Sequence, residues 1–202
     1  MIVEKLKQKL KIILKTETLT LTKLDLITVN FIRYKMQVFK KKLDNFYKWV
    51  KGTELVELTD IDVSEDPVRP ELDLEWRLSS KRKIYGLKFE EDIEAIICVA
   101  FTEEVPTTVR EMDYMSQAAC QDGQQGSIAV AYTVWSRKRG AGREIINKVR
   151  EFLNTSRPTT KRLVTLSPLT PMATHFHISN GARQININPQ TQNFEYKIEV
   201  TT

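Results

Sequence analysis

The segment that most limits how this chain can fold is an uninterrupted strand-to-helix unit in its second half. Residues 127–135 form an apolar, β-branched run that predicts a buried strand. A basic turn with two glycines follows, and residues 141–154 then repeat apolar side chains at helical spacing. The apolar side of that helix consists of Ile145, Ile146, Val149, Phe152 and Leu153. A strand that leads directly into an amphipathic helix predicts a mixed α/β domain.

The rest of residues 52–202 continues the same mixture of short strands and helices. Alternating patterns predict strands at 55–61 and 83–89, and an apolar run predicts a buried strand at 94–101. Residues 64–71 are expected to form a loop, and a short helix could follow Pro70. The further predicted elements are helices at 109–119 and 171–179 and strands at 163–166, 185–187 and 194–200.

The opening quarter of the chain differs from the rest in charge and in its lack of helix breakers. Residues 1–51 contain no Gly or Pro and carry 13 Lys/Arg against 4 Asp/Glu, whereas residues 52–202 carry 18 against 22. Apolar residues at helical spacing predict helices at about 2–15 and 24–50. We therefore expect a basic helical arm, 1–51, and a second domain, 52–202. The arm could serve packing or homo-oligomerisation, bind a nucleic acid or an acidic protein partner, or lie on a membrane surface.

Composition excludes several classes of protein. The chain has 202 residues, enough for one domain with an appendage, and no apolar stretch approaches the ~20 residues of a membrane span. Two cysteines and two histidines argue against a disulfide framework and against a metal site. With no secretory signal at its start, the chain is expected to be cytoplasmic.

The basic turn at 137–143 has the physical properties of an anion site. Gly140 and Gly142 permit close approach to the backbone, and the positive end of a helix begins there. The charged residues of this turn are Arg137, Lys138, Arg139 and Arg143. It matches neither the P-loop nor the dinucleotide fingerprint. The alternative is an ordinary strand–helix turn with a solvated basic rim.

Two motifs in this order resemble the GNAT superfamily of N-acetyltransferases. The acyl-CoA motif of that family, Arg/Gln-x-x-Gly-x-Gly/Ala, corresponds to Arg137-x-x-Gly140-x-Gly142. Its next motif, Asn-x-x-Ala-x-x-x-Tyr-x-x-x-Gly-Phe, has the spacing of Thr170-x-x-Ala173-x-x-x-His177-x-x-x-Gly181-Ala182. Here Thr, His and Ala replace the family's Asn, Tyr and Phe. The resemblance spans residues 54–200 and implies a mostly antiparallel central sheet flanked by helices.

The resemblance also implies a cofactor, acetyl-CoA or another acyl-CoA, and the residues that would hold it. The pyrophosphate would rest on the backbone of residues 139–143, and pantetheine would lie along residues 132–135. A backbone N–H near Val134 would polarise the acyl carbonyl. The implied cofactor-binding residues are Tyr132, Thr133, Val134, Trp135, Arg137, Lys138, Arg139, Gly140, Ala141, Gly142, Arg143, Thr170 and Ala173.

The candidate catalytic residues are His177, Ser167 and Glu103. His177 stands where the family often has its general acid, although a helix residue packing on the cofactor or a core histidine would fit equally. Glu103 is a candidate base, as are Glu104 and Asp113, each of which could instead be a solvated acid. His175 is expected to be structural or exposed.

Ser167 lies in a stretch similar to the Ser-Leu-Ser-Pro of malonyl-CoA decarboxylases, which contain a GNAT-related domain. In that family a serine and a histidine assist decarboxylation, and Ser167 with His177 could form such a pair. Alternatively, Ser167 caps the turn beside Pro168.

The function expected from the resemblance is transfer of an acetyl group from acetyl-CoA to a primary amine. The sequence does not identify the acceptor. The alternative is a catalytically silent GNAT-fold binding or assembly module that acts through the basic arm, and an acyl-CoA decarboxylase is a further alternative.

Overall fold

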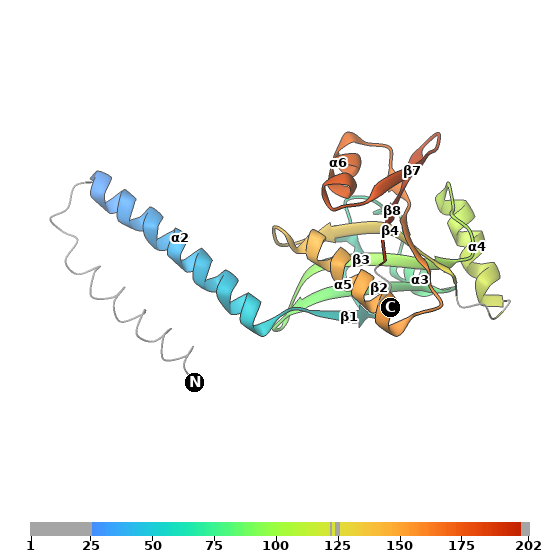
Figure 1. Ribbon diagram of the computed structural model, residues 1–202, viewed down its shortest axis with the longest axis horizontal. Helices are drawn as coiled ribbons and strands as arrows, with labels where there is room; N and C mark the ends of the chain where they lie inside the picture. Colours follow the sequence, from blue (N-terminus) through green and yellow to red (C-terminus); the bar gives the residue numbers. More distant parts are fainter. Residues whose placement is uncertain (1–25, 122, 124–125, 199–202) are drawn as a thin grey trace. The chain divides into compact units, whose positions relative to one another are not determined.

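The fold was analysed in a computed structural model, which describes residues 26–121, 123 and 126–198 (Figure 1). The chain divides into two compact units, one up to Gly52 and one from Thr53 onward. The predicted helix at 2–15, the first residues of the predicted helix at 24–50 and the end of the predicted strand at 194–200 lie outside the described residues.

The first unit contributes one long helix, α2 (Leu26–Lys51). It is uninterrupted because the segment lacks Gly and Pro, and it ends where the N–H of Gly52 donates to the carbonyl of Lys48. Large apolar side chains remain exposed along it, including Phe31 and Tyr34. No helix among the described residues is long and apolar enough to cross a membrane.

The second unit is built on one mixed sheet of eight strands in the order β1-β2-β3-β4-β5-β8-β6, with β7 paired to β8. The pairing is antiparallel except between β4 and β5. The predicted fold class, a mostly antiparallel sheet flanked by helices, is confirmed. The strands are β1 (Glu54–Leu58), β2 (Arg82–Phe89), β3 (Asp92–Thr102), β4 (Ile128–Ser136), β5 (Arg162–Thr165), β6 (Ser167–Pro168), β7 (Arg183–Ile187) and β8 (Thr191–Tyr196).

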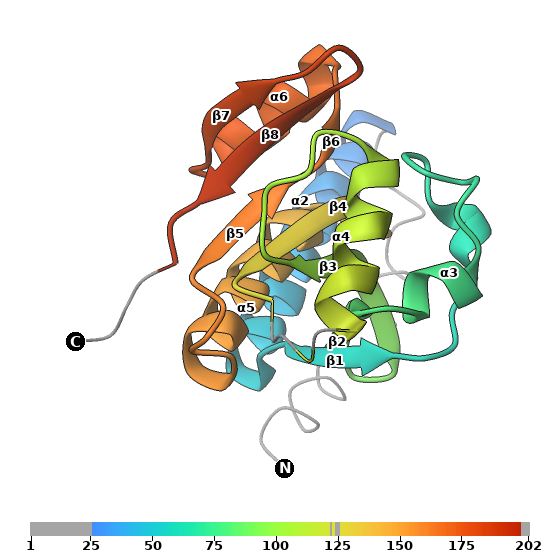
Figure 2. The ribbon, with the colours of Figure 1, turned by 90° about the vertical axis from the view of Figure 1, so that its right-hand side faces the viewer.

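Helices cover both faces of the sheet (Figure 2). Strand β3 is buried on both sides because its alternate residues enter two apolar clusters. One cluster includes Ile97 and contacts α5 (Ala141–Ser156), and the other includes Ile96 and contacts α4 (Val109–Gln121). The remaining helical elements are η2 (Val63–Glu65), α3 (Leu74–Leu78) and α6 (Pro171–Ser179).

Two elements near the C-terminus differ from the predictions. The last described strand, β8, runs from Thr191 to Tyr196 rather than over the predicted 194–200. It begins earlier because polar residues such as Gln192 and Asn193 are buried and hydrogen-bonded through their side chains. The two-residue strand β6 was not predicted, because it is too short to show a periodic pattern.

Candidate functional site

The candidate site begins where two neighbouring strands part. The parallel pairing of β4 with β5 runs only from Ile128 and Arg162 to Ala131 and Thr165. One more bond follows, from the N–H of Leu166 to the carbonyl of Ala131 at 2.9 Å. Strand β4 then continues to Ser136 without a β5 partner, so past this fork its edge is open beyond Tyr132, whose carbonyl accepts from Nε of Arg69.

A cleft with a volume of roughly 370 Å³ lies at this fork. Its walls come from the open edge of β4, the start of α5, helix α6 and the segment around η2. The lining residues are Glu65, Pro67, Val68, Ala131, Tyr132, Thr133, Val134, Trp135, Ser136, Gly142, Ser167, Pro168, Thr170, Met172, Ala173, Phe176 and His177.

The first turn of α5 brings backbone donors to one end of the cleft. Gly140 is the N-cap and has a left-handed conformation, with φ of 89°, which favours glycine. Its carbonyl accepts hydrogen bonds from the N–H groups of Arg143 and Glu144. Within the described part of the chain, the N–H of Gly142 has no backbone acceptor. Gly142 therefore presents a donor at the positive end of a helix, beside the cleft.

Most basic side chains of this turn already have protein partners. The guanidinium of Arg137 pairs with Glu65 at 2.7 Å, and Lys138 pairs with Asp92 and Glu94. Arg143 Nε donates to the side chain of Asn180 at 2.6 Å. The lysine and arginines that the sequence suggested as free anion ligands are thus largely engaged, which leaves the backbone as the main donor.

Helix α6 is placed by its own N-terminal residues. Thr170 is the N-cap, and its side-chain oxygen accepts from the N–H of Ala173 at 3.2 Å. Pro171 occupies the first turn, where its missing N–H costs nothing. Thr170 and Ala173 both line the cleft, and the same helix carries His177 to the fork.

Ser167, His177 and Tyr196 form a buried chain of hydrogen bonds. The Oγ of Ser167 lies 2.8 Å from Nε2 of His177, and Nδ1 of His177 lies 2.8 Å from the Tyr196 hydroxyl. The His177 ring stacks on Phe194, with centroids 4.8 Å apart. Burial lowers the pKa of His177 to about 4, so the imidazole is neutral at pH 7.

The donor and acceptor of each hydrogen bond between Ser167, His177 and Tyr196 follow from the bond that Ser167 makes to Thr165. The hydroxyl of Ser167 donates to Oγ1 of Thr165 at 3.0 Å, so Ser167 accepts from Nε2–H of His177. Nδ1 then accepts from Tyr196, whose pKa is raised by burial, so the phenol keeps its proton. The arrangement can pass a proton toward the Ser167 oxygen in the cleft.

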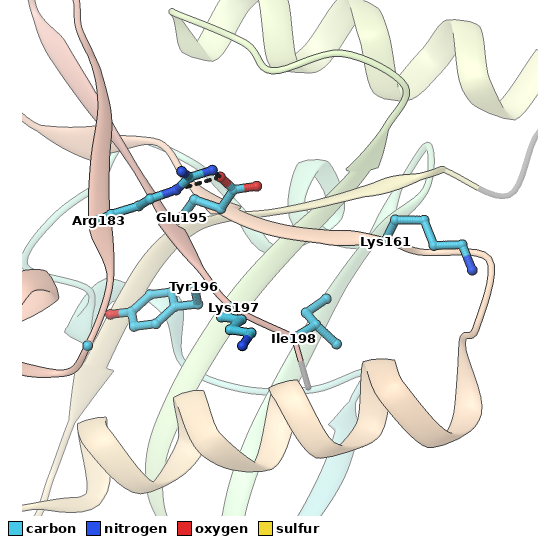
Figure 3. A pocket seen from close by; sticks show the side chains of 7 residues that line it. Lys161, Arg183, Glu195, Tyr196, Lys197 and Ile198 are labelled. Carbon is cyan, nitrogen blue, oxygen red and sulfur yellow. Dashed lines mark hydrogen bonds and ion pairs between the residues drawn. The ribbon is translucent and has the colours of Figure 1, made fainter. Parts of the chain in front are cut away.

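Tyr196, at one end of this series of hydrogen bonds, also lines a second cavity beside β8. This cavity of roughly 420 Å³ is lined by Tyr196 together with charged residues that include Arg183 and Glu195, which are joined by an ion pair of 2.6 Å (Figure 3). Tyr196 therefore borders the second cavity while its hydroxyl bonds to His177, which borders the cleft.

Comparison with known proteins gives matches only among solved structures; no family model and no curated protein matches the chain. An acetyltransferase of the GNAT family from Desulfovibrio desulfuricans is similar at a TM-score of 0.50 and 9% identity, covering 73% of this chain and 100% of that one. The chain has the GNAT fold. The resemblance found in the two sequence motifs is therefore confirmed at the level of the fold.

Two further similar structures have named ligands or activities. The N-acetyltransferase PseH of Campylobacter jejuni, in complex with acetyl coenzyme A, has a TM-score of 0.45 and 12% identity, covering 73% of this chain and 100% of that one. Malonyl-CoA decarboxylase from Cupriavidus metallidurans has a TM-score of 0.44 and 22% identity over 68% of this chain. The present chain spans 37% of the decarboxylase.

The GNAT fold brings nine of the predicted site residues to the cleft and leaves seven outside its lining: Glu103, Arg137, Lys138, Arg139, Gly140, Ala141 and Arg143. Residues from both predicted segments line the cleft. Glu103 does not line it; its carboxylate accepts from the N–H groups of Gly126 and Ser127 at 3.1 and 3.2 Å, and hydrogen bonding from Ser127 lowers its pKa. Asp113 pairs with buried Arg82 at 2.6 Å. The predicted residues that line the cleft are Tyr132, Thr133, Val134, Trp135, Gly142, Ser167, Thr170, Ala173 and His177.

Sequence reasoning missed a buried polar cluster beside the fork. Asp66 and Arg77 form an ion pair of 2.8 Å with both side chains fully buried, and Arg69 is buried next to them. Charged residues in a Pro-containing segment predict an exposed loop, so the pattern concealed these roles. Tyr196 was missed as well, because a tyrosine at the end of a strand has no local signature of its partner.

Proposed function

We propose that this protein binds an acyl-CoA in the cleft and transfers its acyl group to a primary amine. The observation that carries the proposal is the open edge of β4 beyond Tyr132, beside the N–H of Gly142, which has no backbone acceptor among the described residues. An extended pantetheine can bond to such an edge as an additional strand would, and an anion suits the helix N-terminus.

The residues of the cleft fit an acyl-CoA. The backbone of residues 139–143 would hold the pyrophosphate, with the N–H of Gly142 as a donor beside the cleft. A cavity of roughly 370 Å³ suits the acyl-pantetheine arm. The N–H of Arg137 donates to the carbonyl of Glu94 on β3, and backbone groups alternate between the two edges of a strand, so we expect the Val134 N–H on the opposite, open edge. It would donate to the acyl carbonyl.

When bound, the acyl-CoA supplies an activated thioester. Ser167 would give a proton to the leaving thiolate, Nε2–H of His177 would pass its proton to Ser167, and the Tyr196 hydroxyl would pass its proton to Nδ1. The proton that the attacking amine releases would return to Tyr196, which balances the transfer. A hydroxyl supported by imidazole suits this role better than a cationic imidazole here, because burial keeps His177 uncharged.

A second candidate reaction is decarboxylation of a malonyl-type acyl-CoA, and the Ser167–His177 contact favours it. Breaking the bond to a carboxylate requires an oxyanion donor and a proton donor but no external base. Among the described residues that line the cleft, the only carboxylate is Glu65, which is paired with Arg137. Amine attack, in contrast, requires an acceptor that arrives uncharged or brings its own base.

One set of measurements separates these functions. Acetyl-CoA, malonyl-CoA and desulfo-CoA would be titrated calorimetrically into the full chain, and amine acetylation and carbon dioxide release would be assayed in parallel. Acetyl-CoA binding with amine-dependent release of CoA supports the transferase. Carbon dioxide release from malonyl-CoA without an amine supports the decarboxylase. If none of the three binds, both reactions are excluded and the module acting through residues 1–51 becomes the better proposal.

A further inference from the structure

A single arginine connects the two strands at the point where they part. Arg69 Nε donates to the carbonyl of Tyr132 on β4 at 3.1 Å, and its Nη2 donates to the carbonyl of Leu166, just beyond β5, at 3.0 Å. The planar guanidinium presents these donors in a fixed geometry. It thus takes the place of the strand-to-strand hydrogen bonds that end at the fork.

The backbone of Arg69 is itself held by the buried ion pair. Its N–H donates to Oδ1 of Asp66 at 3.3 Å, and its carbonyl accepts from Nη2 of Arg77 at 2.6 Å. Oδ1 of Asp66 also accepts from the hydroxyl of Thr133 at 2.8 Å, which connects this segment to β4. Arg69 is therefore fixed at its main chain and at its guanidinium.

The two carbonyls that Arg69 binds adjoin the groups assigned to the chemistry. Leu166 immediately precedes Ser167, and Tyr132 lies two residues before Val134 on β4. The distance between the Ser167 hydroxyl and the Val134 N–H therefore depends on the separation of these carbonyls.

We propose that Arg69 is a positioning residue that pins the fork and thereby sets the relative placement of Val134 and Ser167. The inference rests on the proposed function for its catalytic consequence, but the pinning is a property of the protein without ligand. A lysine would not reproduce it, because one ammonium cannot present the same planar pair of donors to both carbonyls.

The first test needs no ligand. Hydrogen–deuterium exchange would be compared in the wild type, Arg69→Met and Arg69→Lys, with Arg82→Met as the matched control. Arg82 is also buried and hydrogen-bonded, but it binds Asp113 and does not contact the fork. We expect faster exchange in peptides covering 132–136 and 166–168 in both Arg69 variants and not in Arg82→Met. Unchanged exchange at the fork would overturn the proposal.

The second test separates positioning from general loss of structure. If the fork sets the reacting geometry, Arg69→Lys lowers kcat by about 100-fold, which is the scale of a 1 Å misplacement. The Kd for desulfo-CoA rises much less than kcat falls, because the pyrophosphate site on α5 is separate from the fork even though pantetheine lies along β4. A fall in desulfo-CoA affinity equal to the fall in kcat would contradict the positioning role. Failure of the wild type to bind any acyl-CoA would overturn the proposed function. The hydrogen–deuterium exchange data would still show whether Arg69 holds β4 and the segment after β5 together.

Discussion

Ser167 Oγ and His177 Nε2 lie 2.8 Å apart, although ten residues and a helix N-cap separate them in the sequence. The contact forms because α6 places His177 beside Ser167 at the fork, and Phe194 stacks on one face of the imidazole. A buried neutral imidazole next to a hydroxyl is suited to moving a proton, and this arrangement leads to the first two predictions.

His177→Ala should lower turnover by about 100-fold or more, the contribution typical of general acid–base catalysis. The Kd for CoA should change little, because His177 lies at the acyl end of the cleft. Ser167→Ala should cause a similar loss, and the double variant should be no worse than either single variant, because the two residues act as one unit. Steady-state kinetics and calorimetry on the three variants test this. Additive losses would show that Ser167 and His177 act separately.

Burial of His177 should also make stability depend on pH. The folded pKa of about 4 lies below the unfolded value of 6.5, so the unfolded chain binds the proton first as the pH falls. Neutral His177 therefore contributes fully to the free energy of unfolding above pH 6.5. This contribution decreases between pH 6.5 and pH 4, by about 3 kcal/mol in total. Urea unfolding of the wild type and of His177→Gln at several pH values measures the part of the pH dependence that is due to His177. Parallel pH profiles for the two proteins would contradict it.

Gly142→Glu should abolish CoA binding. The added carboxylate would occupy the positive end of α5 and repel the pyrophosphate, and its bulk would block approach to the backbone. Gly142→Ala is the control, since a Cβ there would only reach ordinary contact with Phe176 at 3.5 Å. Calorimetric titration of CoA should show a much smaller loss for the alanine variant. If Gly142→Glu bound CoA with wild-type affinity, the pyrophosphate would not bind at this turn.

Breaking the buried ion pair should be costly for stability. Asp66→Ala leaves the Arg77 guanidinium uncompensated, and loss of one partner of such a pair costs about 3–5 kcal/mol. The half-exposed pair of Lys83 and Glu57 provides the comparison, because Lys83→Ala should cost less than about 1 kcal/mol. Equilibrium urea unfolding of both variants measures the difference. Equal destabilisation would indicate that Asp66 is more solvated than the structure shows.

Glu103→Gln should leave turnover within about twofold of the wild type, because Glu103 binds backbone N–H groups at the opposite end of β3 from the cleft. Activity assays at saturating substrate provide the check. A large loss of turnover would restore Glu103 as the candidate base and require the acceptor to reach that loop.

The local parts of the fold were predictable, and the long-range parts of the site were not. The strand at 128–136 and the helix at 141–156 follow from apolar runs and helical spacing, and Thr170 with Pro171 defines the start of α6. The contacts of Arg69 with residues 132 and 166 join positions 63 and 97 residues apart. No periodic pattern encodes such a contact, and burial of a guanidinium runs against the usual preference for exposure.

The hydrogen bond from Tyr196 to His177 also bears on how the protein is synthesised. Strand β8 pairs with β5, β6 and β7, so three other strands depend on the last of the described strands to be synthesised. Domains are generally made from the N-terminal end, and the helices and strands up to β5 can begin to pack earlier. The imidazole receives its phenol partner only when residue 196 has emerged. A nascent chain or a nonsense product ending before Thr191 would therefore carry Ser167 and His177 without the strand that holds them together.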